Sequence, residues 1–326
     1  MIDTPAAPVT VKLNERPFLL IAKEEDKKPV SQTITKAVIA AAGFGTRFLP
    51  QTKAMPKEML PLVDKPIIQY VVEELVEAGI RDIIIVTGYN KRSIEDHFDS
   101  PNQDLINNLK AGGESKQPLL AEVEKIANLA NFIYLRQKGP YGGATPVMNA
   151  AHLIGNEPFI YTFADDFFVA TPGRTRQLIQ TYERCHGSVL ACKRATEDSD
   201  YNRYGFAGGQ SVSEHILKVD QIVEKPGKDK APSDLASVSG YLLEPEIFSY
   251  LDQSLKLLSD GQEFYIQPVM QAMIDDGRDF YACEIQNGTY HDTGNKLEYI
   301  KTLVEFAINH PDLNGDVKAY LRRLVS

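Results

Sequence analysis

The stretch KAVIAAAGFGTRFLPQTKAMPKEMLPL, residues 36–62, is the part of the sequence that says most about the fold. It opens with a continuous apolar run, Ala37–Ala42, which is typical of a strand buried on both faces of a sheet. Gly43 and Gly45 follow, and glycine lets the backbone take positive φ angles and bring its N–H groups close to an anion. Arg47 adds a permanent cation whose planar fork matches phosphate oxygens.

The segment after the glycines adds further cations, Lys53 and Lys57, on a path stiffened by three prolines. The glycine pattern alone is also typical of an ordinary turn between a strand and a helix. It does not complete a dinucleotide-binding fingerprint, because Phe48 stands where the third glycine belongs, and the Lys-Ser/Thr ending of a P-loop is missing. Because the cations accompany the glycines, we predict a cradle for a triphosphate.

The composition is that of an ordinary globular protein, with 326 residues, 43% hydrophobic residues and 24% charged residues. The net charge of −9 argues against nucleic acid as a general partner. No apolar run approaches the length of a membrane span, so we expect no membrane partner. Cys185, Cys192 and Cys283 show no metal-binding spacing, which favours buried thiols in a reduced, cytoplasmic setting.

Residues 1–35 differ in character from the rest of the chain. They contain four prolines and the charged cluster Lys23–Lys28, and we predict an N-terminal extension that is mobile or loosely docked. The short apolar run Phe18–Ala22 is compatible with an edge strand or with a subunit contact. We expect residues 36–326 to form a single domain.

An alternation of strands and helices follows the opening stretch. An apolar stripe predicts a helix over 66–78, and a second buried strand is predicted over 82–87, which together give a right-handed parallel unit. Further strands are predicted at 132–135 and 158–164, and the polar stretch 100–118 is predicted to be a loop. This order predicts an α/β fold.

The stretch GFGTRFLPQTKAMPKEMLPLVDKPIIQYVVEE, residues 43–74, resembles the signature of the bacterial sugar-nucleotide pyrophosphorylases. The resemblance covers residues 36–325. It implies a Rossmann-like three-layer αβα nucleotidyltransferase fold with a mixed, mainly parallel central sheet. It also implies Mg²⁺-dependent transfer of UMP from UTP to glucose 1-phosphate, giving UDP-glucose and pyrophosphate, by a homodimer or homotetramer.

The resemblance assigns the first group of site residues. Arg47 and Lys57 would restrain the triphosphate, and Lys225 would orient the attacking phosphate. The residues expected to bind the nucleotide are Ala41, Ala42, Gly43, Gly45, Thr46, Glu58, Gln137 and Gly142.

The base-reading stretch follows the predicted strand at 132–135. A glutamine at a strand end can read a base edge through its amide donor and acceptor, although a surface turn with an incidental glutamine is the plain alternative. By resemblance, Gln137 and Gly142 recognise the pyrimidine. The family commonly has a G-L-G-H-A-like loop where this chain has residues 142–146, GGATP, so the choice of base stays open.

Aspartates at two points suit a metal ion. Asp165 ends the predicted strand at 158–164, where ligands of parallel sheets gather, and Mg²⁺ takes one or two carboxylates plus substrate phosphates. A turn or capping role is the alternative for Asp165, and Asp292 could equally begin the following helix with help from Asn295. By resemblance, Asp165 and Asp292 are the Mg²⁺ ligands and Asp166 supports them. His291 is expected to be a packed or surface residue.

Glu224-Lys225-Pro226 follows a predicted strand at 215–223 and offers an acceptor for hydroxyls beside a cation for phosphate. Alone, this tripeptide is also typical of a solvated turn. By resemblance, it belongs to the sugar 1-phosphate site. The residues expected there are Tyr204, Gly205, Glu224, Val238 and Gly240, beside Lys225.

Three other functions remain compatible with the sequence. They are a related pyrophosphorylase that uses dTTP or another sugar 1-phosphate, a nicotinamide dehydrogenase, and a catalytically silent sugar-nucleotide-binding subunit. The missing third glycine argues against the dehydrogenase.

Overall fold

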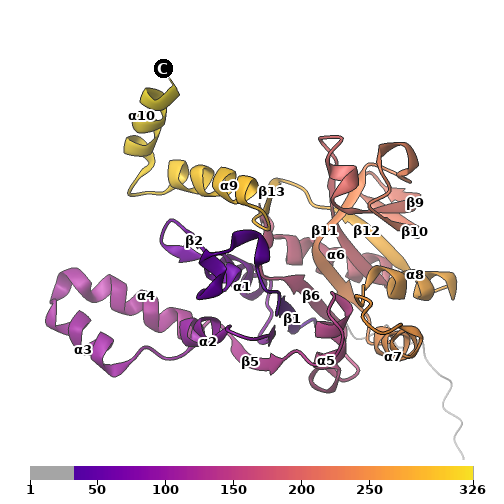
Figure 1. The fold of residues 1–326 in the computed structure, drawn as a ribbon, viewed down its shortest axis with the longest axis horizontal. Helices are drawn as coiled ribbons and strands as arrows, with labels where there is room; N and C mark the ends of the chain where they lie inside the picture. The colour runs from indigo at the N-terminus through magenta and orange to yellow at the C-terminus, as the bar shows by residue number, and fades with distance from the viewer. Residues whose placement is uncertain (1–32, 326) are drawn as a thin grey trace, which may run out of the picture. The chain divides into compact units, whose positions relative to one another are not determined.

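The computed structural model describes residues 33–325, and this part of the chain is built on a nine-stranded sheet of order β5-β4-β1-β6-β11-β8-β12-β10-β9 (Figure 1). All of these strands except β10 and β11 run in the same direction, which confirms the mixed, mainly parallel sheet. The strands are β1 (Lys36–Ala41), β4 (Asp82–Thr87), β5 (Asn131–Arg136), β6 (Phe159–Phe163), β8 (Ser188–Arg194), β9 (Gly205–Ser213), β10 (Ile216–Glu224), β11 (Leu235–Leu243) and β12 (Phe280–Glu284).

Strand β1 lies inside the sheet between β4 and β6 and is paired in parallel with both. Its side chains alternate between the two faces, so Ile39 belongs to one hydrophobic core and Val38 to the other. A strand that must be apolar on both faces reads as a continuous hydrophobic run. The prediction from Ala37–Ala42 is therefore confirmed.

Helices cover both faces of the sheet, which gives the three layers expected from the resemblance. The core on one face is closed by α1, α2 and α6, and the core on the other face by α5, α7 and α8. The helices are α1 (Ile67–Glu77), α2 (Arg92–Phe98), α3 (Gln103–Ala111), α4 (Gln117–Ala127), α5 (Ala144–Ile154), α6 (Arg174–Cys185), α7 (Ile247–Leu257), α8 (Gln267–Asp275), α9 (Lys296–Asn309) and α10 (Asn314–Val325).

Two small sheets complete the described fold. Strand β7 (Asp166–Ala170) pairs antiparallel with β13 (Gly288–Asp292), and β2 (Pro61–Leu62) pairs with β3 (Lys65–Pro66). Because β7 begins directly after Asp165, its pairing with β13 brings the end of β13 to the carboxyl end of β6. This places Asp292 near Asp165.

One sequence prediction about the fold is wrong. The stretch 100–118, predicted to be a loop, contains helix α3 and the start of α4. Asn102 caps α3 by accepting a hydrogen bond from the Asp104 N–H at 2.7 Å, and Leu109 is the one residue of α3 that is buried. A helix with so little buried surface leaves a weak hydrophobic pattern in the sequence.

Other expectations have mixed outcomes. Cys192 and Cys283 are buried free thiols, as expected, whereas Cys185 is partly exposed. Within residues 33–325, no helix is long and apolar enough to cross a membrane. Residues 1–32 of the predicted extension 1–35 lie outside the described residues. That the extension is mobile or loosely docked, and that residues 36–326 form a single domain, therefore stay predictions.

Candidate active site

The glycine loop leaves β1 and turns at Gly45, whose φ of 65° lies in the left-handed region that glycine adopts without strain. A Cβ on Gly45 would lie 3.2 Å from the Lys57 side chain and 3.1 Å from that of Thr52. The Thr52 hydroxyl donates to the Gly45 carbonyl at 2.7 Å, which fixes the turn. The glycine is therefore required both for its conformation and for the close approach of Lys57.

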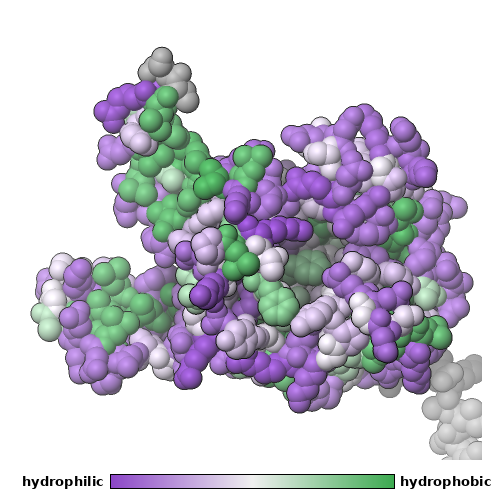
Figure 2. Space-filling view, viewed as in Figure 1, coloured by the Kyte–Doolittle hydropathy of each residue, from purple (hydrophilic) through white to green (hydrophobic). Residues whose placement is uncertain are grey.

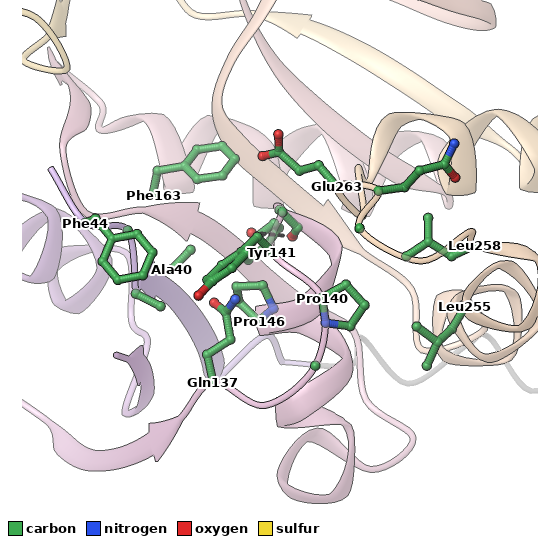
Figure 3. A pocket seen from close by; sticks show the side chains of 18 of the residues that line it. Ala40, Phe44, Gln137, Pro140, Tyr141, Pro146, Phe163, Leu255, Leu258 and Glu263 are labelled. Carbon is green, nitrogen blue, oxygen red and sulfur yellow. Dashed lines mark hydrogen bonds between the residues drawn. The ribbon is translucent and has the colours of Figure 1, made fainter. Parts of the chain in front are cut away.

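A cavity of about 880 Å³, here the larger cavity, opens beside this loop above the ends of the parallel strands. Figure 2 shows that this face of the protein is hollowed near its middle, and Figure 3 shows the side chains that surround the space. Its lining includes Ala42, Gly43, Phe44, Lys57, Glu58, Gln137, Tyr141, Gly142, Phe163, Asp165 and the loop 259–263.

Two ion pairs involve charged residues that line the larger cavity, namely Lys57, Glu58 and Asp165. Lys57 Nζ lies 2.5 Å from Asp165 Oδ2, and Lys91 Nζ lies 2.6 Å from Glu58 Oε2. Burial alone would lower the pKa of Lys57, but the nearby carboxylates of Asp165 and Glu58 outweigh it and raise this pKa. Burial raises the pKa of Glu58, although Lys91 opposes it. Lys57 is thus held as a cation beside Asp165 at the larger cavity.

The opposite wall of the larger cavity is the loop after β5. The Gln137 N–H donates to the Thr87 carbonyl at 2.8 Å and extends the strand pairing by one residue. Gly142 has a φ of 125°, and a Cβ there would overlap the backbone of Phe264. The Phe264 N–H donates to the Tyr141 carbonyl at 2.6 Å. The loop is therefore clamped to the segment before α8, and the backbone of Gln137 is held by its pairing with Thr87.

A second cavity of about 500 Å³, here the smaller cavity, opens over the antiparallel part of the sheet. Its walls carry many ionisable side chains. The lining includes Arg47, Asp165, Asp166, Arg203, Tyr204, Gly205, Glu224, Lys225, Ser237, Val238, Ser239, Tyr290 and Asp292.

Asp165 and Asp292 converge where the two cavities meet. The Thr293 hydroxyl and N–H both donate to the Asp165 carbonyl, at 2.5 and 3.1 Å, and so hold the end of β13 against the end of β6. A Cβ on Gly294 would lie 3.0 Å from Asp292 Oδ1 and 3.6 Å from Asp165 Oδ2. The two carboxylates therefore flank one small volume, and Arg47 Nη1 lies 3.6 Å from the same point.

The surroundings of these carboxylates are basic and aromatic. Arg203 lies 2.5 Å from Asp292 Oδ2, and the Tyr204 hydroxyl donates to the same oxygen at 3.1 Å. The Tyr290 hydroxyl donates to Asp166 at 2.9 Å. Burial, followed by the charges of Asp165 and Asp292, raises the pKa of Asp166 to about 7.

Asp292 does not cap the helix that follows it. Asn295, not Asp292, is the N-cap of α9, and its side chain accepts a hydrogen bond from the Glu298 N–H at 3.1 Å. Asp292 ends β13 and points into the smaller cavity. His291 is packed, with its ring stacked on Phe167 at 5.3 Å between ring centroids, in agreement with the expectation of a packed residue.

The backbone of Lys225 is strained. Its φ is 47°, a left-handed value that is uncommon for a non-glycine residue, and its N–H donates to the Tyr204 carbonyl at 3.1 Å. Lys225 Nζ lies 3.6 Å from Glu224 Oε1. Lys225 and Glu224 therefore line the smaller cavity side by side, and both are exposed to solvent. Their role in holding a sugar phosphate stays a prediction.

A bulge in β11 forms the far wall of the smaller cavity. Ser239 has a φ of 61° and Gly240 a φ of 114°, and a Cβ on Gly240 would overlap the Tyr161 carbonyl. The buried guanidinium of Arg174 donates to the Ser239 carbonyl and hydroxyl and lies 2.8 Å from Glu74. This buried network supports the bulge, and the bulge turns Val238 toward the cavity.

The structure brings most of the predicted residues together at these two cavities, with four exceptions. Ala41 is buried in the core, and Gly45 shapes the loop from behind. Thr46 lines a third cavity of about 290 Å³ on the other side of the glycine loop, and Gly240 lies beneath the wall that Val238 forms.

Other lining residues were missed by the sequence interpretation. Phe44, Tyr141 and the loop 259–263 line the larger cavity, and Arg203 and Tyr290 line the smaller one. Phe44 lies between the two glycines of the glycine loop and Arg203 directly precedes Tyr204, so their positions beside predicted site residues were a usable signal. The loop 259–263 carries no motif, because only the tertiary fold brings it to the cavity.

These features define a nucleotidyl transferase, and the chain belongs to that family: the model of the nucleotidyl transferase family matches residues 36–307. The chain is 42% identical over 291 residues to the UTP–glucose-1-phosphate uridylyltransferase of Staphylococcus epidermidis, covering 89% of this chain and 98% of the relative. It is 44% identical over 295 residues to the Bacillus subtilis enzyme of the same name, covering 90% and 98%. The predicted resemblance is confirmed.

Solved structures agree with this assignment. A UTP-bound enzyme of this kind from Acinetobacter baumannii superposes with a TM-score of 0.80 at 32% identity, covering 90% of this chain and 100% of that one. A UDP-glucose pyrophosphorylase complexed with UDP-glucose gives a TM-score of 0.72 at 35% identity, covering 84% and 98%. The αβα nucleotidyltransferase fold is therefore confirmed.

Proposed function

We propose that this enzyme transfers UMP from UTP to glucose 1-phosphate, giving UDP-glucose and pyrophosphate, and thus has UTP–glucose-1-phosphate uridylyltransferase activity. The observation that carries the proposal is that two cavities, with Lys57 in the lining of one and Arg47 and Lys225 in that of the other, meet at Asp165. The names of the relatives support the same substrates.

The reaction needs no nucleophile from the protein. An oxygen of the sugar phosphate attacks the α-phosphorus of UTP, a new P–O bond forms, and the bond to the β-phosphate bridging oxygen breaks. The protein holds two anions together and compensates the charge that develops between them.

We assign the chain's own groups as follows. The glycine loop and Lys57 hold the triphosphate in the larger cavity, while Arg47 reaches the junction from the same loop. Gln137 and the backbone at Gly142 face the base. In the smaller cavity Lys225 orients the sugar phosphate, and Glu224 and the backbone of Val238 take the sugar.

A divalent metal ion is general in the nucleotidyl transferase family, and we propose Mg²⁺ here. The fit rests on the donor set: Asp165 and Asp292 bring hard carboxylate oxygens to one small volume. Among the described residues, no group of three or more His, Cys, Asp or Glu side chains could hold a metal ion. Two carboxylates agree with a cation that keeps waters and substrate phosphates as its other ligands, and Mg²⁺ bound there would supply charge compensation.

We also propose a cytoplasmic homodimer or homotetramer. The buried free thiols are compatible with a reducing compartment. On the C-terminal helices Leu297, Ile300, Tyr320 and Leu324 are more than half exposed, and Figure 2 shows apolar residues gathered along α10. Light scattering on the full chain tests this: a monomer at micromolar concentration would contradict it.

The experiment that tests the function is pyrophosphate release with Mg²⁺ and glucose 1-phosphate, comparing UTP, dTTP, CTP, ATP and GTP. We expect a strong preference for UTP. Preference for dTTP, or for another sugar 1-phosphate, would keep the mechanism and change the substrate. Nucleotide binding without pyrophosphate release from any pair would establish a catalytically silent subunit instead.

A further inference from the structure

Two large aromatic side chains stand exposed at the larger cavity. Phe44 is 56% exposed and Tyr141 is 66% exposed, and both line the cavity. Their rings touch edge to face, with centroids 5.5 Å apart and an interplanar angle of 61°. Figure 3 shows the two rings together, with the side chain of Gln137 directed to the same space. Exposed aromatic groups gathered at a cavity indicate a binding surface.

The two rings come from segments far apart in the sequence, and both backbones are fixed. Phe44 precedes Gly45, whose turn is held by the Thr52 hydroxyl. Tyr141 precedes Gly142 and is clamped through its carbonyl to Phe264. Aromatic side chains have two rotatable torsions, so ordering them against a ligand costs little conformational entropy. The pair is therefore a nearly preorganised apolar surface.

The ring pair has no part in the roles assigned so far to the cations and carboxylates. Of the groups on the proposed substrates, the phosphates and the sugar have no flat π-face, whereas the nucleotide base has one. Stacking on an aromatic ring is available to every base, because every base has a π-face. Gln137, which offers an amide to a base edge, lies in the same cavity.

We propose that Phe44 and Tyr141 form an aromatic wall against which the base of the bound nucleotide packs. The wall rests on the proposed function, because it requires a nucleotide in the larger cavity. Affinity and specificity then come from different groups in that cavity. The rings provide affinity for any base, and Gln137 with the Gly142 backbone determines which base is preferred. Tyr141 lies just before the GGATP segment that departs from the common family loop.

The test uses Phe44→Ala, Tyr141→Ala and the double variant. We expect the KM for UTP and the Kd for UDP-glucose to rise about 5- to 150-fold, the range for loss of one base-stacking ring. The kcat and the KM for glucose 1-phosphate at saturating UTP should change less than about twofold. The ratio of kcat/KM between UTP and CTP should stay unchanged, whereas Gln137→Ala should change it.

Two control variants separate stacking from structural effects. Tyr141→Phe keeps the ring and should bind UDP-glucose like the wild type. Tyr89→Ala removes an aromatic side chain that is 87% exposed and does not line the larger cavity, and it should change neither constant. Unfolding midpoints of all variants, measured in parallel, identify any loss of folding. Phe44→Leu retains an apolar side chain without a ring and gives a second test at that position.

An unchanged Kd for UDP-glucose and KM for UTP in the folded double variant would contradict the proposal of an aromatic wall. A changed ratio of kcat/KM between UTP and CTP in the ring variants would show that the rings also contribute to base specificity. If the wild-type chain bound neither UTP nor UDP-glucose, the proposed function would fail and the wall with it. That result differs from wild-type binding that the variants leave intact, in which only the wall fails.

Discussion

The two cavities lie over two differently built parts of one sheet. The larger cavity is reached from the ends of the parallel strands β1, β5 and β6. Glycine loops, main chain and aromatic side chains line it around the ion pair of Lys57 and Asp165. The smaller cavity is reached from β9, β10, β11 and β13, whose pairings are antiparallel, and it is lined by ion-paired side chains.

This difference predicts in which cavity a substitution lowers nucleotide affinity and in which it lowers turnover. A wall of backbone and aromatic rings makes many modest contacts, so a change there is expected to act on nucleotide affinity. A wall of paired charges places single groups at the reacting atoms, so a change there is expected to act on kcat. Three predictions test this contrast in order of decreasing effect, and a fourth, smaller one concerns the packed histidine on β13.

Asp165→Asn should have the largest effect, because Asp165 belongs to both cavities. The neutral amide removes the ion pair with Lys57 and one proposed metal ligand. We expect turnover to fall by a factor on the order of 100 or more, with loss of the Mg²⁺ dependence of pyrophosphate release. Asp96→Asn, at an exposed site on α2, is the matched control. Unchanged Mg²⁺ titration in the Asp165 variant would remove this residue from the metal site.

Lys225→Ala should lower kcat by about a hundredfold, because the cation that orients the sugar phosphate is lost. UTP binding, measured by calorimetry, should be unchanged, since Lys225 lines only the smaller of the two cavities. Lys228→Ala is the control, because Lys228 is exposed and pairs with Asp198 at 2.7 Å. A Lys225 variant with near wild-type turnover would contradict the assignment.

Gly142→Ala should act on the larger cavity alone. A Cβ would overlap Phe264, so the clamped loop must move, and we expect the KM for UTP to rise about tenfold, equal to about 1.4 kcal/mol. Gly155 also has a positive φ, 68°, but nothing lies within 4 Å of its Cβ position. Gly155→Ala should therefore lose stability with no change in KM. Equal kinetic effects of both variants would show that backbone strain alone is responsible.

The smallest effect concerns pH and His291. Burial lowers the pKa of His291, with Glu305 opposing it. The unfolded chain then binds the proton more readily, so this contribution to stability is full above pH 6.5, the ordinary value for histidine, and is lost as the pH falls toward the lowered pKa. His97 acts in the same direction.

His291→Phe, which keeps a ring on Phe167, should therefore lose less stability than the wild type between pH 7.5 and 5.5. Urea unfolding midpoints at the two pH values measure this. An equal loss in both proteins would show that the proton taken up on unfolding goes elsewhere.

The parallel half of the fold was predicted well from the sequence. Strand β4 has the predicted bounds, because a strand covered by helices on both faces must be continuously apolar. The antiparallel half was predicted less well. Strand β9 contains Gly208 and Gly209, and its register with β10 is interrupted by a bulge, so no regular alternation marks it.

The candidate site shows the same division. Gly43, Arg47 and Lys57 are close together in the sequence, so their residue types alone indicated phosphate. Glu224, Lys225 and Asp292 were assigned only through the family resemblance, because β10 and β13 belong to different sheets and only the tertiary fold brings their ends to one cavity. The contact between Phe44 and Tyr141 has no sequence signal, since it depends on two loops that meet only in the fold.

Of the described residues that line them, the two cavities share Phe163 and Asp165, at the end of β6. Because the two cavities share so few lining residues, parts of the smaller cavity are candidates for exchange between related enzymes. We expect that the segment from residue 200 to residue 224, which carries β9 and β10 at the edge of the sheet, can be exchanged with that of a relative without disturbing the loops on the nucleotide side. The acceptor could then be changed while the donor chemistry is inherited intact.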